Sequence, residues 1–157
     1  MTLREQIITA LQGEGAHAGF DDSISGFDPR LRGKRPPGSA HSAWELLEHL
    51  RLAQHDILEF TRNDPGYAPL DFPGGYWPKS PEPPDDGAWD RSVEAFRADL
   101  RAFCDHVADE SNDLLAPLPQ SSSGASILAQ ALLTADHNSY HLGQLVMLRR
   151  LLGNWEG

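Results

Sequence analysis

Apolar side chains recur every three or four residues along four stretches of this chain of 157 residues, which is the spacing of helices that bury one face. We find no stretch in which polar and apolar residues alternate as they do in strands. The pattern therefore predicts an all-α protein, a four-helix bundle with helices near residues 1–12, 42–62, 89–107 and 125–152.

The first of these stretches is interrupted early. After residues 1–12, Gly13 and Gly15 break or bend the helix. Apolar spacing resumes from His17 to Phe27, so we expect a second helical piece or the remainder of a kinked first helix. His17 lies on this apolar stripe and could reach a central metal, but a single histidine in such a place is more often buried with one hydrogen-bond partner.

Two of the predicted helices have recognisable starts. Ser42 and Glu45 fit a capping box, in which the serine hydroxyl and the glutamate carboxylate each accept from the other residue's backbone N–H. Asp85 or Asp86 is placed to cap the helix over residues 89–107. We therefore expect both helices to begin at these side chains.

Three long connections separate the predicted helices, at residues 28–40, 63–85 and 111–124, and connections of this length are compatible with crossovers. Residues 63–85 contain seven of the twelve prolines and several aromatic side chains. A disordered linker would be poor in such apolar groups. We expect this loop to pack over one end or flank of the bundle, either as a plain cover of the core or as the wall of a substrate pocket.

Composition and charge narrow the class of protein. The length suits one sizeable core, so we expect a single domain over residues 1–157. The net charge of −10 argues against nucleic acid or an anionic membrane as a partner. No apolar run approaches the roughly 20 residues of a membrane span and no signal-peptide pattern is present, which favours a cytoplasmic protein. The single cysteine, Cys104, excludes an internal disulfide and a thiolate-rich zinc site, and we expect it to pack.

Three histidines fall on predicted inward faces. His137 and His141 lie four residues apart, a spacing that turns their side chains only about 40° apart on a helix, so both can reach one ion. His49 falls on the inward arc of the helix over residues 42–62. If the three converge, they suit zinc, nickel, copper or iron and leave a coordination position for water or substrate. Three core histidines with ordinary hydrogen bonds are the alternative. We place the others just before a helix or on the surface: His41, His55 and His106.

Other chemistries have less support in the sequence. A carboxylate-bridged di-iron bundle needs Glu-x-x-His motifs, and the nearest inward carboxylate, Glu45, is engaged as a cap. We see no Ser-His-Asp or Cys-His arrangement, so we do not expect a covalent enzyme nucleophile. Four basic residues within residues 28–40 are compatible with an anionic substrate, but a solvated loop is the simpler interpretation.

Three segments together resemble the DinB-like superfamily of bacterial proteins: residues 44–51 around His49, the Tyr76-Trp77-Pro78 loop, and residues 135–144 with their His-x-x-x-His-x-Gly-Gln element. The resemblance covers nearly the whole chain. It implies a four-helix bundle of up-down-down-up order and frequent homodimers. It also implies a divalent metal, zinc or nickel, with these ligands: His49, His137 and His141.

The activities of this superfamily are less uniform than its fold. Some relatives use a low-molecular-weight thiol in S-transfer or isomerisation, some resemble metal-dependent hydrolases, and many have no assigned activity. We therefore expect a metal-dependent thiol transferase or hydrolase that acts on a small molecule. A non-catalytic metal-binding or stress-response interaction protein is the alternative. Gln144 could hydrogen-bond a ligand of the metal or brace the helix packing, and Asp136 and Tyr140 are weaker candidates beside the histidines.

Overall fold

The computed structural model describes residues 1–13 and 15–155. Over these residues it contains no β-strand, and none of its helices is long and apolar enough to cross a membrane. The predicted all-α class is confirmed. The structure has five α-helices and two short 3-10 helices: α1 (Leu3–Gln12), α2 (Phe20–Ile24), η1 (Pro29–Leu31), α3 (Ala43–Arg62), η2 (Gly74–Tyr76), α4 (Ala88–Ala108) and α5 (Ile127–Leu151).

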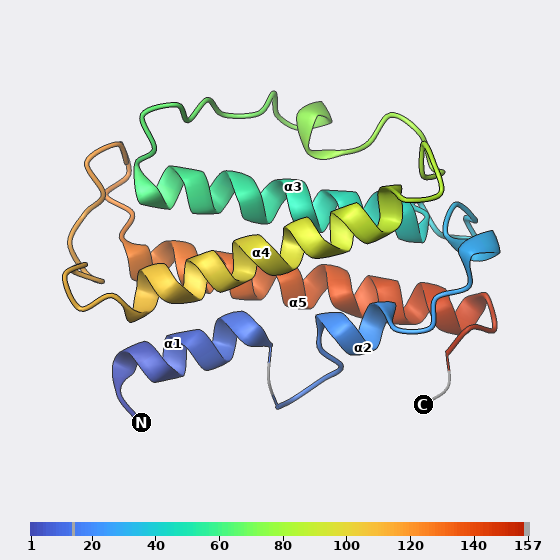
Figure 1. Ribbon diagram of the computed structural model, residues 1–157, viewed down its shortest axis with the longest axis horizontal. Coiled ribbons are helices and arrows are strands. Elements are labelled where there is room, and N and C mark those ends of the chain that lie inside the picture. Colours follow the sequence, from blue (N-terminus) through green and yellow to red (C-terminus); the bar gives the residue numbers. More distant parts are fainter. Residues whose placement is uncertain (14, 156–157) are drawn as a thin grey trace.

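Four of the helices run side by side along the length of the molecule (Figure 1). α1 and α5 run in one direction, and α3 and α4 run in the other. Both α4 and α5 contact α1 and α3, while the short α2 packs against α5. The long connection between α3 and α4 passes over the outer side of α3 (Figure 1).

The core consists of two apolar clusters that follow one another along these helices. The first contains Leu47 of α3 and Leu145 of α5, and the second contains Leu58 of α3 and Ala131 of α5. Polar residues that are also buried lie between them on the same two helices. The apolar periodicity predicted this seam correctly on α4, where its members are buried or half-buried: Trp89, Val93, Phe96, Leu100, Phe103 and Val107.

The segment after α1 is less helical than expected, and His17 does not lie on a buried face. Gly13 adopts a left-handed φ of 68° and ends α1. The next helix is only the five residues of α2. His17 is exposed in the connection, with its Nδ1 3.0 Å from the carbonyl oxygen of Ala18. The prediction that His17 lies on an apolar stripe and could reach the metal site is therefore wrong.

The helix starts confirm one predicted cap and correct the other. Ser42 and Glu45 form the capping box, with Ser42 Oγ accepting from the Glu45 N–H at 3.2 Å and the carboxylate accepting from the Ser42 N–H at 2.8 Å. α4 instead begins after Gly87, which has no side chain to cap it. Asp85 accepts from the Gly87 N–H at 2.9 Å, so this carboxylate fixes the turn that precedes the helix.

Two side chains near the end of α4, those of Cys104 and His106, are half-buried. His106, predicted on the surface, is half-buried because Asn112 folds back and donates to the His106 carbonyl oxygen at 2.9 Å. Cys104 is half-buried against the second apolar cluster, and burial raises the pKa of its thiol to about 11. Its expected role in packing is confirmed.

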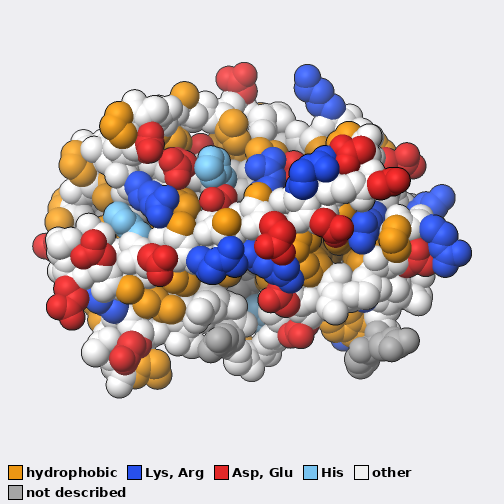
Figure 2. Space-filling model, viewed as in Figure 1, with side chains coloured by type: hydrophobic (Ala, Val, Ile, Leu, Met, Phe, Trp, Pro, Cys, Tyr) orange, Lys and Arg blue, Asp and Glu red, His pale blue; other side chains and the backbone are white. Residues whose placement is uncertain are grey.

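Two of the four basic side chains of the loop at residues 28–40 form ion pairs within the part of the chain that the structure describes. Arg30 pairs with Asp28 at 2.7 Å, and Arg35 Nε donates to the Glu45 carboxylate at 2.8 Å. Acidic and basic groups are likewise intermixed across the face of the molecule shown in Figure 2. These pairs favour a solvated loop over an anion-binding patch.

Candidate metal centre

The three histidines singled out from the sequence meet between α3 and α5. His49 Nε2 lies 3.1 Å from Nε2 of His137 and 3.1 Å from Nε2 of His141. One ligand atom from each ring can be chosen so that all three lie within 4.8 Å of one another. His49 and His141 are buried, and His137 is half-buried. Three imidazoles from two helices therefore face one point.

The hydrogen bond on the far side of His49 fixes its tautomer. Its Nδ1 lies 2.9 Å from the carbonyl oxygen of Tyr76, and this oxygen can only accept. Nδ1 must therefore carry the hydrogen. In the neutral ring, Nε2 then keeps a free lone pair, which points toward the other two histidines.

His141 is held in the same way by Gln144. Its Nδ1 lies 2.7 Å from Gln144 Oε1, which accepts the hydrogen and leaves the Nε2 lone pair free. In the structure, the Gln144 amide orients a histidine of the cluster. Gln144 and the Tyr76 carbonyl thus each accept the Nδ1–H of one histidine and fix its tautomer. A hydrogen bond from Gln144 to a molecule bound at the metal stays a prediction.

With these tautomers, the Nε2 atoms of His49 and His141 lie 3.1 Å apart and both carry a lone pair, which is repulsive unless a cation lies near both. Burial lowers the pKa of all three histidines, that of His141 to about 4, so the rings are neutral at neutral pH. Two nitrogens bound at about 2.0–2.1 Å to one tetrahedral ion lie roughly 3.3 Å apart. The donor type, the tautomers and the spacing all fit a divalent transition metal.

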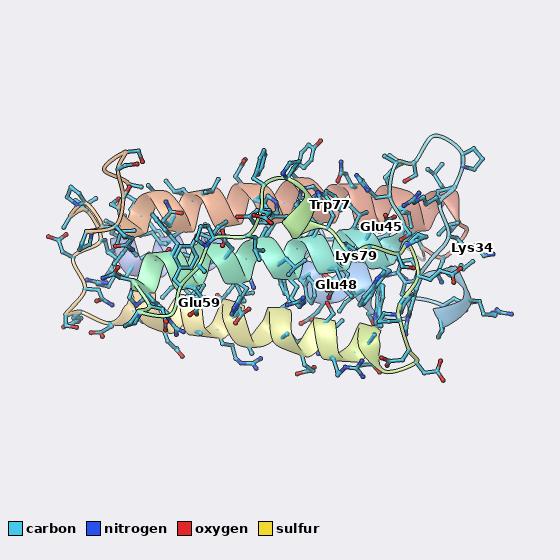
Figure 3. The ribbon with its side chains drawn as sticks, turned by 90° about the horizontal axis from the view of Figure 1, so that it is seen from above. Lys34, Glu45, Glu48, Glu59, Trp77 and Lys79 are labelled. Carbon is cyan, nitrogen blue, oxygen red and sulfur yellow. The ribbon has the colours of Figure 1, made fainter. Side chains whose placement is uncertain are left out.

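The loop between α3 and α4 covers one side of this cluster. The ring of Trp77 stacks on His49, with centroids 3.9 Å apart and planes 2° apart. His41 stacks on the other face of Trp77 at 4.0 Å. Figure 3 shows the loop with Trp77 and Lys79 crossing above α3. The expectation that residues 63–85 pack over a flank is confirmed, and part of this loop lies against the histidines.

Tyr76 is anchored to α3 at its other end. Its hydroxyl donates to the Asp56 carboxylate at 2.7 Å, and burial together with this carboxylate raises the pKa of the phenol. The backbone carbonyl that orients His49 therefore belongs to a residue tied to the same helix as His49. This contact fixes the position of the loop relative to the His49 imidazole.

The two remaining candidates lie at the edge of the site. Tyr140 is 64% exposed, and its ring lies nearly perpendicular to that of His141, with the centroids 4.9 Å apart. Asp136 is exposed and its charge opposes the lowering of the His137 pKa by burial. Neither side chain hydrogen-bonds a histidine of the cluster within the part of the chain described, so both stay candidates without an assigned role.

A pocket of about 560 Å³ lies beside the cluster. Gln144, Tyr140 and His41 line it, and each of these residues contacts either a cluster histidine or Trp77. The rest of the lining is largely apolar and comes from α5, the loop before α3 and Leu46 of α3. The three histidines do not themselves line this pocket, which reaches the cluster through Gln144 and Tyr140. Hollows of about 760 and 700 Å³ have neither the histidines nor these two neighbours in their walls.

The fold and the site together define an all-helical protein in which three histidines are close enough to bind a divalent metal. A family model described as the DinB superfamily matches residues 12–145, a range that includes all three histidines and Gln144. The chain belongs to this superfamily, and the resemblance seen in the sequence is confirmed. No curated protein and no solved structure matches it.

Proposed function

We propose that this protein is a metal-dependent enzyme, either a low-molecular-weight-thiol S-transferase or a hydrolase, that acts on a small molecule. His49, His137 and His141 would hold one divalent transition metal, zinc or nickel, and leave a coordination position open. The observation that carries this proposal is that three Nε2 atoms converge while two of the rings have their Nδ1–H groups committed elsewhere. Membership of the DinB superfamily supports it.

The charge of the cluster favours an anionic reactant. All three ligands are neutral imidazoles, so they leave the double charge of a divalent ion uncompensated. When bound, such an ion lowers the pKa of a coordinating thiol or water and polarises a carbonyl or similar group. Tyr76 and Gln144 keep the rings in the tautomer that this requires, and Trp77 shields one face of His49 from water.

A reacting thiol would come from outside the chain. Cys104 lies on α4, apart from the cluster, and burial holds the pKa of its thiol near 11, so it is protonated at neutral pH. The largely apolar pocket beside Gln144 offers a place for a small organic substrate. We therefore propose a small electrophile with an apolar group as the substrate and a soluble thiol or water as the attacking reagent.

We further propose that the chain forms one domain, a four-helix bundle of up-down-down-up order, and that two copies associate through α5. The directions of α1, α3, α4 and α5 in Figure 1 support this order.

The proposed association of two copies rests on one face of α5. Leu133, Tyr140 and Met147 are exposed and spaced seven residues apart, so they share this face. Light scattering would test the dimer: Met147→Glu should give a monomer, and an unchanged mass would contradict association through this face.

The second candidate is a non-catalytic metal-binding or stress-response interaction protein. The stacking of Trp77 between His41 and His49 favours it, because this contact covers one side of the cluster and narrows the approach of a substrate. Turnover of a panel of electrophiles with and without a thiol, before and after chelation, separates the two. Loss of turnover on chelation supports an enzyme, whereas a panel without turnover on metal-loaded protein supports the binding role.

Metal content tests the proposal at its base. Protein purified without an affinity tag should contain about one equivalent of a divalent transition metal, and His137→Ala should lose it because two imidazoles remain. His55→Ala is the matched control, since His55 is exposed on α3 and pairs with Asp99 at 3.0 Å, outside the cluster. Equal metal content in the parent and His137→Ala would overturn the proposal.

A further inference from the structure

Three buried polar residues lie in the middle of the core, between its two apolar clusters. Gln54 of α3 and Thr134 of α5 are 0% exposed, and Asn138 of α5 is 5% exposed. Burying an amide among apolar side chains is costly unless its hydrogen bonds are made, so such groups need a reason to be there. Asn138 directly follows His137, which links this layer to the histidine cluster.

A chain of hydrogen bonds fixes the orientation of both amides. The carbonyl oxygen of Phe96 on α4 can only accept, and Gln54 Nε2 donates to it at 2.8 Å. Gln54 Oε1 is then free to accept, and Asn138 Nδ2 donates to it at 2.9 Å. The remaining atom of the second amide, Asn138 Oδ1, is therefore an acceptor, and its position is set by a backbone group on another helix.

His137, the third histidine of the cluster, lacks the hydrogen bond at Nδ1 that His49 and His141 make. His137 Nδ1 is buried without a hydrogen-bond partner, and so is Asn138 Oδ1. Burial lowers the pKa of His137, and the neighbouring Asn138 side chain, acting as an acceptor for the ring N–H, opposes this change. A buried donor and a buried acceptor, here on adjacent residues, each cost free energy while they are unpaired.

We infer that Asn138 and Gln54 are positioning residues for the metal site: Asn138 Oδ1 accepts the Nδ1–H of His137 and thereby directs the Nε2 lone pair of this ring toward His49 and His141. The inference rests on the proposed function, because it concerns how the third ligand is oriented. Each ring then has its own acceptor, namely a backbone carbonyl for His49, Gln144 for His141 and Asn138 for His137. Such outer partners hold a ring in its tautomer and orientation.

The test compares two substitutions of one residue by zinc affinity, measured in competition with a chromophoric chelator. Asn138→Leu removes the acceptor and should weaken zinc binding about 10- to 100-fold. Asn138→Asp keeps an oxygen for the Nδ1–H and should bind zinc at least as tightly as the parent, although it loses the N–H that Gln54 accepts. Thr61→Val is the matched control, because Thr61 is buried on α3 and donates only to the Ile57 carbonyl; its zinc affinity should not change.

A spectroscopic measurement distinguishes positioning from plain packing. In the zinc-loaded parent, the Nδ1–H proton of His137 should give a slowly exchanging NMR signal, because it is buried and hydrogen-bonded. The signal should persist in Asn138→Asp and vanish in Asn138→Leu. If Asn138→Leu does not fold, Gln54→Met takes its place, since it frees the Asn138 amide to turn and should weaken zinc binding several-fold.

Two outcomes would overturn the inference, and they differ from failure of the proposed function. Zinc affinity and the Nδ1–H signal could stay unchanged in Asn138→Leu, or Asn138→Asp could bind as poorly as Asn138→Leu. Either result would leave the three-histidine site in place while removing the role of Asn138. A parent protein that binds no zinc would overturn the proposed function instead.

Discussion

Both ends of the α3–α5 pair bury an apolar cluster, but only one of these clusters borders the histidines. At one end, Leu58 and Ala131 pack with Phe103 in a cluster of apolar residues. At the other end, the apolar cluster around Leu145 borders His49 and the other two histidines. Apolar burial therefore stabilises both ends, and the end that holds the histidines carries the added cost of desolvating three imidazoles.

The largest change in the free energy of unfolding should come from the apolar cluster that does not border the histidines, which contains Phe103. Phe103 is fully buried on α4, so Phe103→Ala should lower the free energy of unfolding by about 3–5 kcal/mol through lost contacts and a cavity. Urea denaturation would measure this change. Zinc affinity of the folded variant should match that of the parent, and a parallel loss of affinity would show that the two ends are not independent.

Metal removal should lower the free energy of unfolding, and this effect should depend on the three histidines. With zinc at about 100 times its dissociation constant, binding adds roughly 2.7 kcal/mol to the free energy of unfolding. Denaturation with and without chelator should show this difference in the parent and in His55→Ala, but not in His49→Ala. A chelator effect that persisted in His49→Ala would place the metal elsewhere.

A smaller effect concerns the start of α3 and depends on pH. Burial opposes ionisation of Glu45, but hydrogen bonds from Arg35 and Ser42 outweigh it and lower the pKa of the carboxyl below 4.5. Because the folded-state pKa is the lower one, this contribution is present above about pH 4.5 and is lost as the pH falls further. Glu45→Gln should cost about 1 kcal/mol at pH 7. The gap between parent and variant should shrink on acidification, and a constant gap would contradict the assignment.

The smallest effect is a gain in stability beside the site. Gly143 lies within α5, and a Cβ there would meet nothing within 4 Å. Gly143→Ala should therefore raise the free energy of unfolding by up to about 1 kcal/mol through helix propensity alone. Thermal denaturation would detect it, and zinc affinity should be unchanged. A loss of stability would mean that this face of α5 is not open.

The helices and the three histidines were predictable because both depend on local spacing. An apolar face has a period of 3.6 residues, and His137 and His141 are a fixed turn apart on one helix. His17 shows the limit of this reasoning, since its spacing fits a helix that Gly13 and Gly15 prevent. Periodicity says which face a residue would take, but it does not say where the helix ends.

The partners of the histidines were not predictable in the same way. The acceptor for His49 is a backbone carbonyl, and every residue of the 63–85 loop offers one, so only the fold selects Tyr76. The aromatic residues of this loop did indicate that it packs, but not that Trp77 stacks on a histidine. Gln54 and Asn138 lie on two different helices and are 84 residues apart in sequence, so no local pattern predicts their hydrogen bond.

The most direct test of the central claim is X-ray absorption at the metal edge of the zinc-loaded parent. The account predicts three imidazole nitrogens at about 2.0–2.1 Å and one further light ligand from solvent or buffer. A sulfur neighbour, or a first sphere with fewer than three imidazoles, would contradict it.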